Sequence, residues 1–118
     1  MNNEITPCLE VEVFYLERMA LPGEVLVSVN LEDVSRQDVA ALTLASQSLR
    51  TDNGVPFTFK LRYDPSVIKD NHVYSVRARI EHEGRLIWTS TSAHTVDLNK
   101  LPGKPVHLRM EQVSTDRG

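Results

Sequence analysis

The segment from Tyr74 to Ser90 reads YSVRARIEHEGRLIWTS and decides the fold class. Apolar residues occupy every second position of its first half, which is the period of a β-strand with one face on a core. The pair Glu83-Gly84 then marks a tight turn, and the alternation resumes after it through Leu86 and Trp88. The segment therefore predicts a β-hairpin whose inward row begins at Tyr74.

The same two-residue period recurs along most of the chain. Turn signals such as Leu21-Pro22-Gly23 and Asn53-Gly54 separate the alternating stretches. Residues 39–49 (VAALTLASQSL) fit either a short helix or an edge strand, and we favour the strand because Leu42 and Leu44 alternate with polar residues. The clearly alternating stretches outside the hairpin are residues 9–15, 25–32, 57–63, 94–98 and 106–110.

This spacing of short strands is typical of an antiparallel sandwich or a small barrel. Fourteen valines and eight threonines against six alanines also favour strands over helices. We expect an all-β, antiparallel Greek-key-like β-sandwich of seven to eight short strands. At most one short helical turn is expected, where Asp64 caps Pro65. The expected organisation is a flexible segment over residues 1–8, a single domain over 9–113 and a frayed tail over 114–118.

Composition excludes several classes of protein. The net charge of −3 gives no reason to expect a nucleic-acid partner. A single cysteine excludes an intramolecular disulfide, and no apolar run approaches the roughly 20 residues needed to cross a bilayer. The opening residues MNNEITP lack the features of a signal peptide, and Pro7 before Cys8 argues against a lipobox. A membrane contact is therefore expected only through a lipid anchor that is not evident in this chain.

No motif for catalysis, cofactor binding or metal binding emerges. His72, His82, His94 and His107 are too far apart to form a paired metal motif. The chain has no G-x-S-x-G elbow and no Gly-rich phosphate loop. Glu10 and Glu12 have the spacing of carboxylates on one strand face, which we interpret as the solvent side of a sheet. We expect no enzyme activity, no cofactor and no metal.

A row of cations is the one candidate binding surface. If the strands that carry them pair, four basic side chains share an outward sheet face, continued by one further arginine and an exposed isoleucine. The simpler alternative is a solvated face neutralised by Glu81 and other carboxylates. As a binding surface the row would take an acidic or amphipathic partner segment. Its residues are Lys60, Arg62, Arg77, Arg79, Arg85 and Ile87.

Two aromatic residues have expected structural roles. Tyr74 ends the stretch Asp70-Asn71-His72-Val73-Tyr74, which resembles a tyrosine corner, in which the phenol hydrogen-bonds to an upstream backbone group. Trp88 lies on an inward row and is expected to be the largest residue of the core. Only Phe14 is clearly on outward parity, so an aromatic platform for a sugar would be thin.

Several segments together resemble one known family. They are YLERMALP (15–22), VLVSVNLEDVS (25–35), PFTF (56–59), YDP (63–65), YSVRARI (74–80) and GRLIWTS (84–90). In this order and spacing they are similar to the YbaY/YscW lipoprotein family, over roughly residues 13 to 98. The resemblance implies a β-sandwich of the bacterial envelope, and it provides no catalytic residue.

The resemblance also implies a function. YscW-type members are pilotins, outer-membrane lipoproteins that bind the C-terminal end of a type III secretion secretin and guide its delivery and assembly, whereas YbaY-type members have no well-defined role. We therefore expect a non-enzymatic, chaperone-like protein-binding module at the periplasm or the inner face of the outer membrane. The alternative function is a domain that binds carbohydrate or another small ligand. The alternative location is the cytoplasm, because this chain shows no signal peptide or good lipobox.

Overall fold

The computed structural model describes residues 7–35, 40–90, 94–98 and 105–113. The expected tail and most of the expected N-terminal segment lie outside these ranges. The described residues contain one 3-10 turn, η1 (Pro65–Val67), and no helix that is long and apolar enough to cross a membrane. The strands are β1 (Cys8–Phe14), β2 (Val25–Asp33), β3 (Leu42–Thr51), β4 (Phe57–Arg62), β5 (Tyr74–His82), β6 (Arg85–Ser90), β7 (His94–Val96) and β8 (Val106–Gln112).

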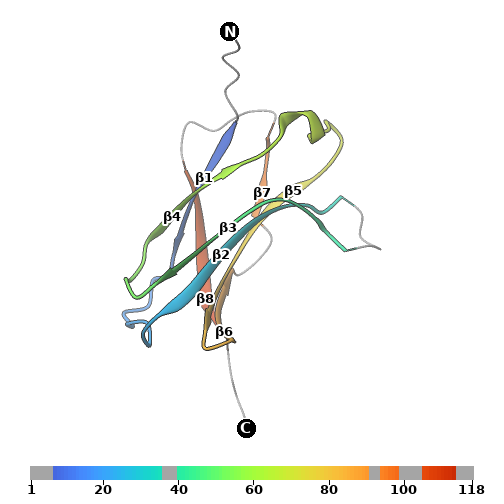
Figure 1. Cartoon of the computed structure of the whole chain (residues 1–118). Helices are drawn as coiled ribbons and strands as arrows, with labels where there is room; N and C mark the ends of the chain where they lie inside the picture. The colour runs from blue at the N-terminus through green and yellow to red at the C-terminus, as the bar shows by residue number, and fades with distance from the viewer. Residues whose placement is uncertain (1–6, 36–39, 91–93, 99–104, 114–118) are drawn as a thin grey trace.

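The all-β prediction is thus confirmed, and the ambiguous segment 39–49 contributes a strand, β3. The strands form one sheet in the order β3-β2-β5-β6-β8-β1-β4, with β7 paired to the remaining part of the β5 edge (Figure 1). This sheet curls until its two end strands, β3 and β4, come next to each other. The fold is therefore a nearly closed barrel.

The predicted Greek-key sandwich is wrong. Strand β8 pairs with β6 on one side and with β1 on the other, so the layers that a sandwich would keep apart are joined into a single sheet. The β1–β8 pair is also parallel, with Val11 opposite Val106. Alternating patterns report one buried face per strand but not which strands pair, so a sandwich and a barrel give the same signal.

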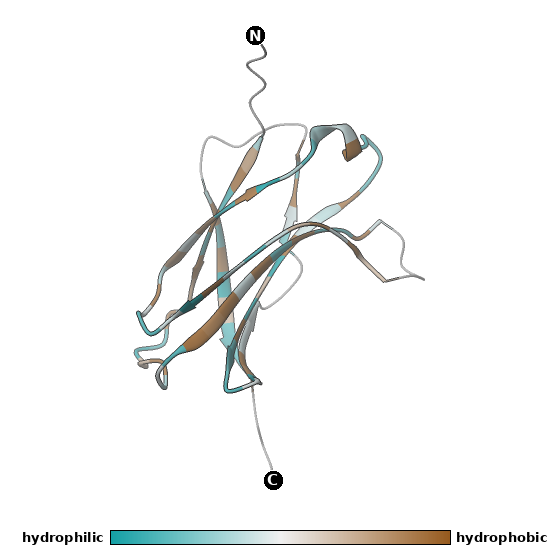
Figure 2. Ribbon diagram, in the orientation of Figure 1, coloured by the Kyte–Doolittle hydropathy of each residue, from teal (hydrophilic) through white to brown (hydrophobic). Residues whose placement is uncertain are grey.

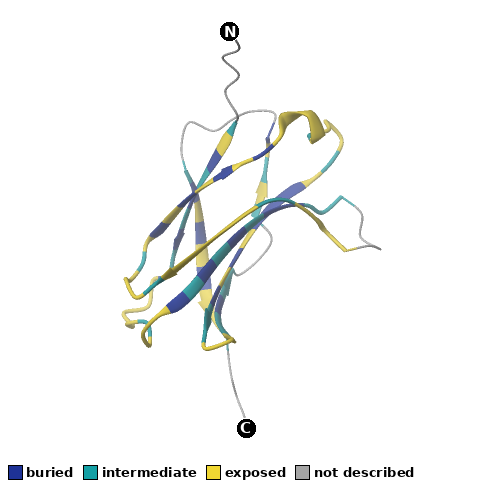
Figure 3. Cartoon of the chain, viewed as in Figure 1, coloured by how far each residue is buried: buried dark blue, intermediate teal, exposed yellow. Residues whose placement is uncertain are grey.

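The core is formed by the inward rows of the barrel (Figures 2 and 3). On β2, four inward residues from Val25 to Leu31 are at most 1% exposed, and β4 alternates strictly between buried and exposed side chains. The expected inward row of β5 is buried in full, and Trp88 is 3% exposed. The periodicity therefore identified the core-facing side of these strands correctly.

The β5–β6 hairpin is built as its sequence predicts. Glu83 and Gly84 both have positive φ angles, 53° and 79°, as a two-residue type I′ turn requires. The tyrosine corner is confirmed as well, because the Tyr74 hydroxyl accepts a hydrogen bond of 2.8 Å from the Lys69 N–H.

The expected helical turn is η1. Its cap, Asp64, accepts a hydrogen bond of 2.9 Å from the Ser66 N–H. Hydrogen bonds from the Ser66 backbone and hydroxyl lower the pKa of Asp64. This turn belongs to the connection between β4 and β5, which passes over one end of the barrel (Figure 1).

A polar cluster ties the end of β2 to the connection before β5. Asp33 accepts hydrogen bonds from the Ser35 N–H and hydroxyl, at 3.0 and 2.6 Å, and its other oxygen lies 2.6 Å from Nδ1 of His72. The Ser35 hydroxyl in turn accepts from the Val73 N–H at 2.7 Å. Burial opposes ionisation of Asp33, but the hydrogen bonds from Ser35 and His72 and the charge of His72 outweigh it and lower its pKa to about 2.

Candidate partner-binding site

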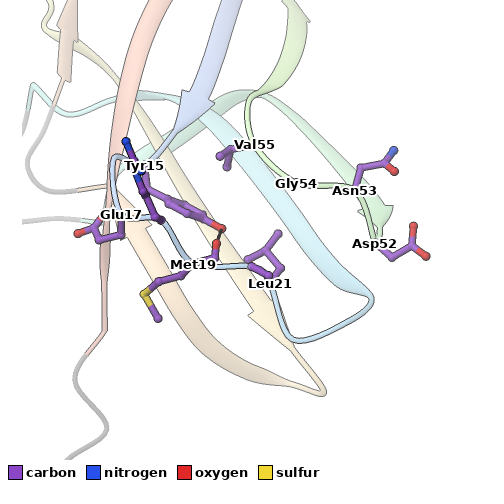
Figure 4. Close-up of a pocket in the computed structure, with 10 residues that line it drawn as sticks. Tyr15, Glu17, Met19, Leu21, Asp52, Asn53, Gly54 and Val55 are labelled. Atoms are coloured by element: carbon purple, nitrogen blue, oxygen red, sulfur yellow. Dashed lines mark hydrogen bonds between the residues drawn. The ribbon is translucent and has the colours of Figure 1, made fainter.

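A hollow of about 400 Å³ opens at the end of the barrel where β1 finishes (Figure 4). It lies between two connections far apart in sequence, the β1–β2 connection and the β3–β4 turn. Its volume falls within the range of roughly 300–1,000 Å³ that is typical of ligand sites. The lining residues are Tyr15, Glu17, Arg18, Met19, Ala20, Leu21, Asp52, Asn53, Gly54 and Val55.

Tyr15 anchors the hollow to the core. Its ring stacks on Trp88, with ring centroids 3.9 Å apart and an angle of 8° between the planes. Its hydroxyl donates a hydrogen bond of 2.6 Å to the carbonyl oxygen of Met19, which fixes the shape of the β1–β2 connection. Burial, assisted by the charge of Glu17, raises the pKa of Tyr15, so the phenol stays protonated and remains a donor at neutral pH.

The lining of the hollow combines apolar side chains with charged ones. Leu21 and Val55 are half-buried and pack against the core, and Met19 is 45% exposed. Glu17, Arg18 and Asp52 add charges of both signs. A flexible methionine beside aliphatic side chains suits the capture of an apolar group of varied shape. The hollow can therefore hold an apolar side chain of a partner while the charged residues contact its polar neighbours.

The predicted row of cations is not assembled as one face. Strand β4 pairs with β1, and β5 pairs with β2, β6 and β7, so the condition on which the row depended is not met. Three strands separate β4 from β5 in one direction around the sheet. Lys60 and Arg62 therefore lie apart from Arg77 and Arg79. Pairing between strands distant in sequence is not encoded in the local alternation.

The cations on β5 are partly matched by acids. Arg79 forms an ion pair of 2.6 Å with Glu81, as expected if the cations lie on a solvated face that carboxylates neutralise. Arg77 Nε lies 3.6 Å from Oε1 of Glu32, a residue only 7% exposed, and this oxygen accepts no hydrogen bond from the described residues. The cations of β5 thus act in part as counterions within the fold.

The remaining members of the row differ in exposure. Lys60, Arg62 and Arg85 are exposed as predicted. Ile87 is not the exposed residue that was predicted, because it is half-buried and packs against the core. Glu10, which lies opposite Lys60 on β1, is also only half-exposed.

The histidines make separate contacts. His72 binds Asp33, His82 Nδ1 lies 3.1 Å from the Glu24 carbonyl oxygen, and His107 Nε2 lies 2.8 Å from Glu12. No group of three or more potential metal ligands occurs in the ranges that the structure describes. Each of these three histidines thus contacts a different acidic residue or its backbone.

The sequence pattern did not predict the hollow. Leu21-Pro22-Gly23 and Asn53-Gly54 each mark a turn, but nothing in their composition shows that the two connections meet. The available signal was the apolar character of Leu16 and Met19 in a connection, where polar residues are usual. In the structure Leu16 is 62% exposed on the same connection, although it does not line the hollow.

Comparisons with known proteins relate the chain to bacterial lipoproteins. The family model described as "Type III secretion system lipoprotein chaperone (YscW)" matches residues 5–110. The "Uncharacterized lipoprotein YbaY" of Escherichia coli (strain K12) is 26% identical over 91 residues, which make up 76% of this chain and 48% of that protein. The chain thus spans about half the length of this curated relative.

A solved structure agrees closely with the fold. An alternative pilotin from the type II secretion system of Vibrio cholerae superposes with a TM-score of 0.78 at 36% sequence identity. The match covers 91% of this chain and 98% of that one. The similarity therefore extends over almost the whole barrel.

Proposed function

Because the chain belongs to the YscW family of type III secretion system lipoprotein chaperones, we propose that it is a non-enzymatic, pilotin-like module that binds the C-terminal segment of a secretin. The structural likeness to a pilotin supports this proposal. The family description refers to type III secretion and the structural neighbour to type II, so secretins of both systems are candidate partners.

The observation on this chain that carries the proposal is the hollow, whose lining includes the apolar side chains of Met19, Leu21 and Val55. A partner segment needs a place to bury at least one apolar anchor, because a few desolvated anchors provide most of the affinity of a protein interface. The hollow offers that place beside Met19, with Tyr15 held rigid beneath it by the stack on Trp88. A rigid site lowers the entropic cost of binding.

The geometry of β1 also fits a membrane-anchored chaperone. β1 begins at Cys8 and runs for seven residues toward the hollow, a length of roughly 20 Å. The hollow is thus at the opposite end of the barrel from the start of β1. A lipid anchor on the N-terminal side would leave the hollow facing away from the membrane, available to a partner in the periplasm.

Binding to synthetic secretin peptides tests the proposal. Peptides covering the C-terminal 20 or so residues of type II and type III secretins would be titrated into the protein by calorimetry. We expect one class to bind and Met19→Glu to weaken that binding about tenfold or more, because the new carboxylate would lose water when an apolar side chain of the peptide enters the hollow. Leu16→Glu, on the same connection but outside the lining, is the matched control.

The competing function is tested with the same proteins on a glycan array. The volume of the hollow also fits a small ligand, which is the observation that favours this alternative. Glycan binding without capture of any secretin peptide would overturn the proposal. Equal losses of peptide affinity for the Met19 and Leu16 variants would show that the hollow is not where the peptide binds.

A further inference from the structure

We propose that the seam between the unpaired edges of β3 and β4 receives an extended segment of the protein partner, which adds to β3 as a further strand. This inference rests on the proposed peptide-binding function and specifies how the peptide is bound. The segment would place apolar side chains toward the core and acidic side chains outward. In Figure 1, β3 and β4 leave their shared turn together and diverge toward the other end of the barrel.

The edge of β3 is open to strand addition. β3 is ten residues long and pairs only with β2. One bulge interrupts it, at the register shift opposite Leu31 and Glu32, and from Ala45 to Thr51 the pairing with β2 is regular. Edge strands are usually protected by charges, prolines or short length, yet residues 40–49 contain no charged residue and no proline.

The core-facing side of β3 lacks the cover that the other strands have. Leu49 lies opposite Val27 on β2, which is fully buried, but Leu49 itself is 42% exposed. The five consecutive residues from Ser46 to Arg50 are all exposed, whereas β4 alternates between buried and exposed residues (Figure 3). A strand alongside β3 would supply the missing neighbour and bury the apolar surface of Leu49.

The charges beside the seam define the other face of the partner. β3 and β4 carry three cations, Arg50, Lys60 and Arg62, and no acidic residue. None of the three forms an ion pair with another residue in the described part of the chain. Glu10 lies opposite Lys60 on β1, but Arg50 and Arg62 have no acidic residue opposite them in the strand pairing. Acidic side chains on the outward row of an added strand would meet these cations, which would steer the segment and fix its register.

The seam leads to the hollow. The turn that joins β3 to β4 contributes Asp52, Asn53, Gly54 and Val55 to the lining (Figure 4). A segment that pairs with β3 therefore arrives at the hollow, where one further apolar side chain can enter beside Met19. The main-chain hydrogen bonds would provide affinity and the hollow would provide specificity, as in other cases of strand addition.

Amide hydrogen exchange distinguishes this mode from other kinds of docking. The ¹⁵N-labelled protein would be saturated with the tightest-binding secretin peptide, and exchange would be followed by NMR. We expect slower exchange at alternate amides between Ala45 and Thr51, because every second N–H of an edge strand points toward an added strand. Tight binding without alternate protection on β3 would overturn the inference and leave the proposed function standing. Failure of every peptide to bind would overturn both.

A pair of lysine substitutions provides a second readout. Leu49→Lys places a charge on the core-facing row of β3, and we expect peptide affinity to fall about tenfold or more. Val73→Lys changes a residue of similar exposure, 45%, that does not lie on β3, and we expect less than about a twofold change. Equal losses of peptide affinity for the two variants would contradict binding at the seam. The proposal would also be contradicted if the wild-type protein formed a concentration-dependent dimer that Leu49→Lys abolishes, because a second copy of the chain would then occupy the seam.

Discussion

Tyr15 is the residue that connects the core to the candidate site. It is 7% exposed, it stacks on Trp88, and its hydroxyl holds the carbonyl group of Met19. Tyr15 falls on the core-facing row of the alternating stretch 9–15, which predicts its burial. Its hydrogen bond depends on the path of the β1–β2 connection, which the alternation does not encode. The side chain therefore contributes to stability through its ring and to the shape of the hollow through its hydroxyl.

Tyr15→Phe separates these two roles. It keeps the stacked ring and removes the hydrogen bond to Met19, so we expect a loss of about 1 kcal/mol in the free energy of unfolding. Tyr15→Ala also removes the ring, and we expect a loss of about 3–5 kcal/mol. Urea denaturation measures both. Equal costs for the two variants would mean that the hydroxyl group, and not the ring, determines the contribution of Tyr15.

Asp33 makes stability depend on acidity. Its pKa is about 2 in the folded protein against an ordinary value of 3.8. The stabilisation is fully present above the unfolded value and is lost as the pH falls through about 2, because the protonated group no longer accepts these bonds as an anion. The side chain is 15% exposed, so solvent screens the interaction only partly.

Asp33→Asn tests this linkage. At pH 7 we expect the free energy of unfolding of the variant to be about 2 kcal/mol lower than that of the wild type, in line with a shift of roughly two pKa units. The difference should narrow as the pH falls from about 5 toward 2. Denaturation curves across this range provide the measurement. A difference that stays constant with pH would show that the aspartate acts through packing alone.

At the scale of elements, the sequence predicted the strands well and their partners poorly. The inward rows of β2, β4 and β5 follow from alternation, because burial on one face imposes a two-residue period. The separation of Lys60 from Arg77 could not be predicted, since it depends on β8 joining β6 to β1. The place of β3 at the end of the sheet agrees with the edge strand favoured from the sequence, and the polar run from Ser46 to Ser48 already breaks the alternation of a covered strand.

Arg77 and Arg79 provide a matched pair on one strand. Arg77→Ala leaves the buried carboxylate of Glu32 without its cation, and we expect a cost of about 1–3 kcal/mol in unfolding free energy. Arg79→Ala removes an ion pair with the more exposed Glu81, and we expect a cost below about 1 kcal/mol. Chemical denaturation compares the two. A larger cost for Arg79 would show that Glu32 needs no cation.

At the scale of the molecule, a single sheet curls into a barrel that stays open along the seam. The two ends of the sheet meet at the β3–β4 turn, and the same turn lines the hollow. One end of the barrel thus combines an uncovered strand edge with a hollow lined in part by apolar side chains. This combination would suit the capture of an extended peptide, as proposed above.

The emission of Trp88 tests this account most directly. Trp88 is the chain's one tryptophan, it is 3% exposed, and it stacks on Tyr15 in the lining of the hollow. Titration with a secretin C-terminal peptide is predicted to change its fluorescence saturably. Met19→Glu should move the midpoint of this titration to a peptide concentration about tenfold higher or more, while Leu16→Glu leaves the midpoint unchanged. Peptide binding detected by calorimetry with no change in Trp88 emission would contradict the account.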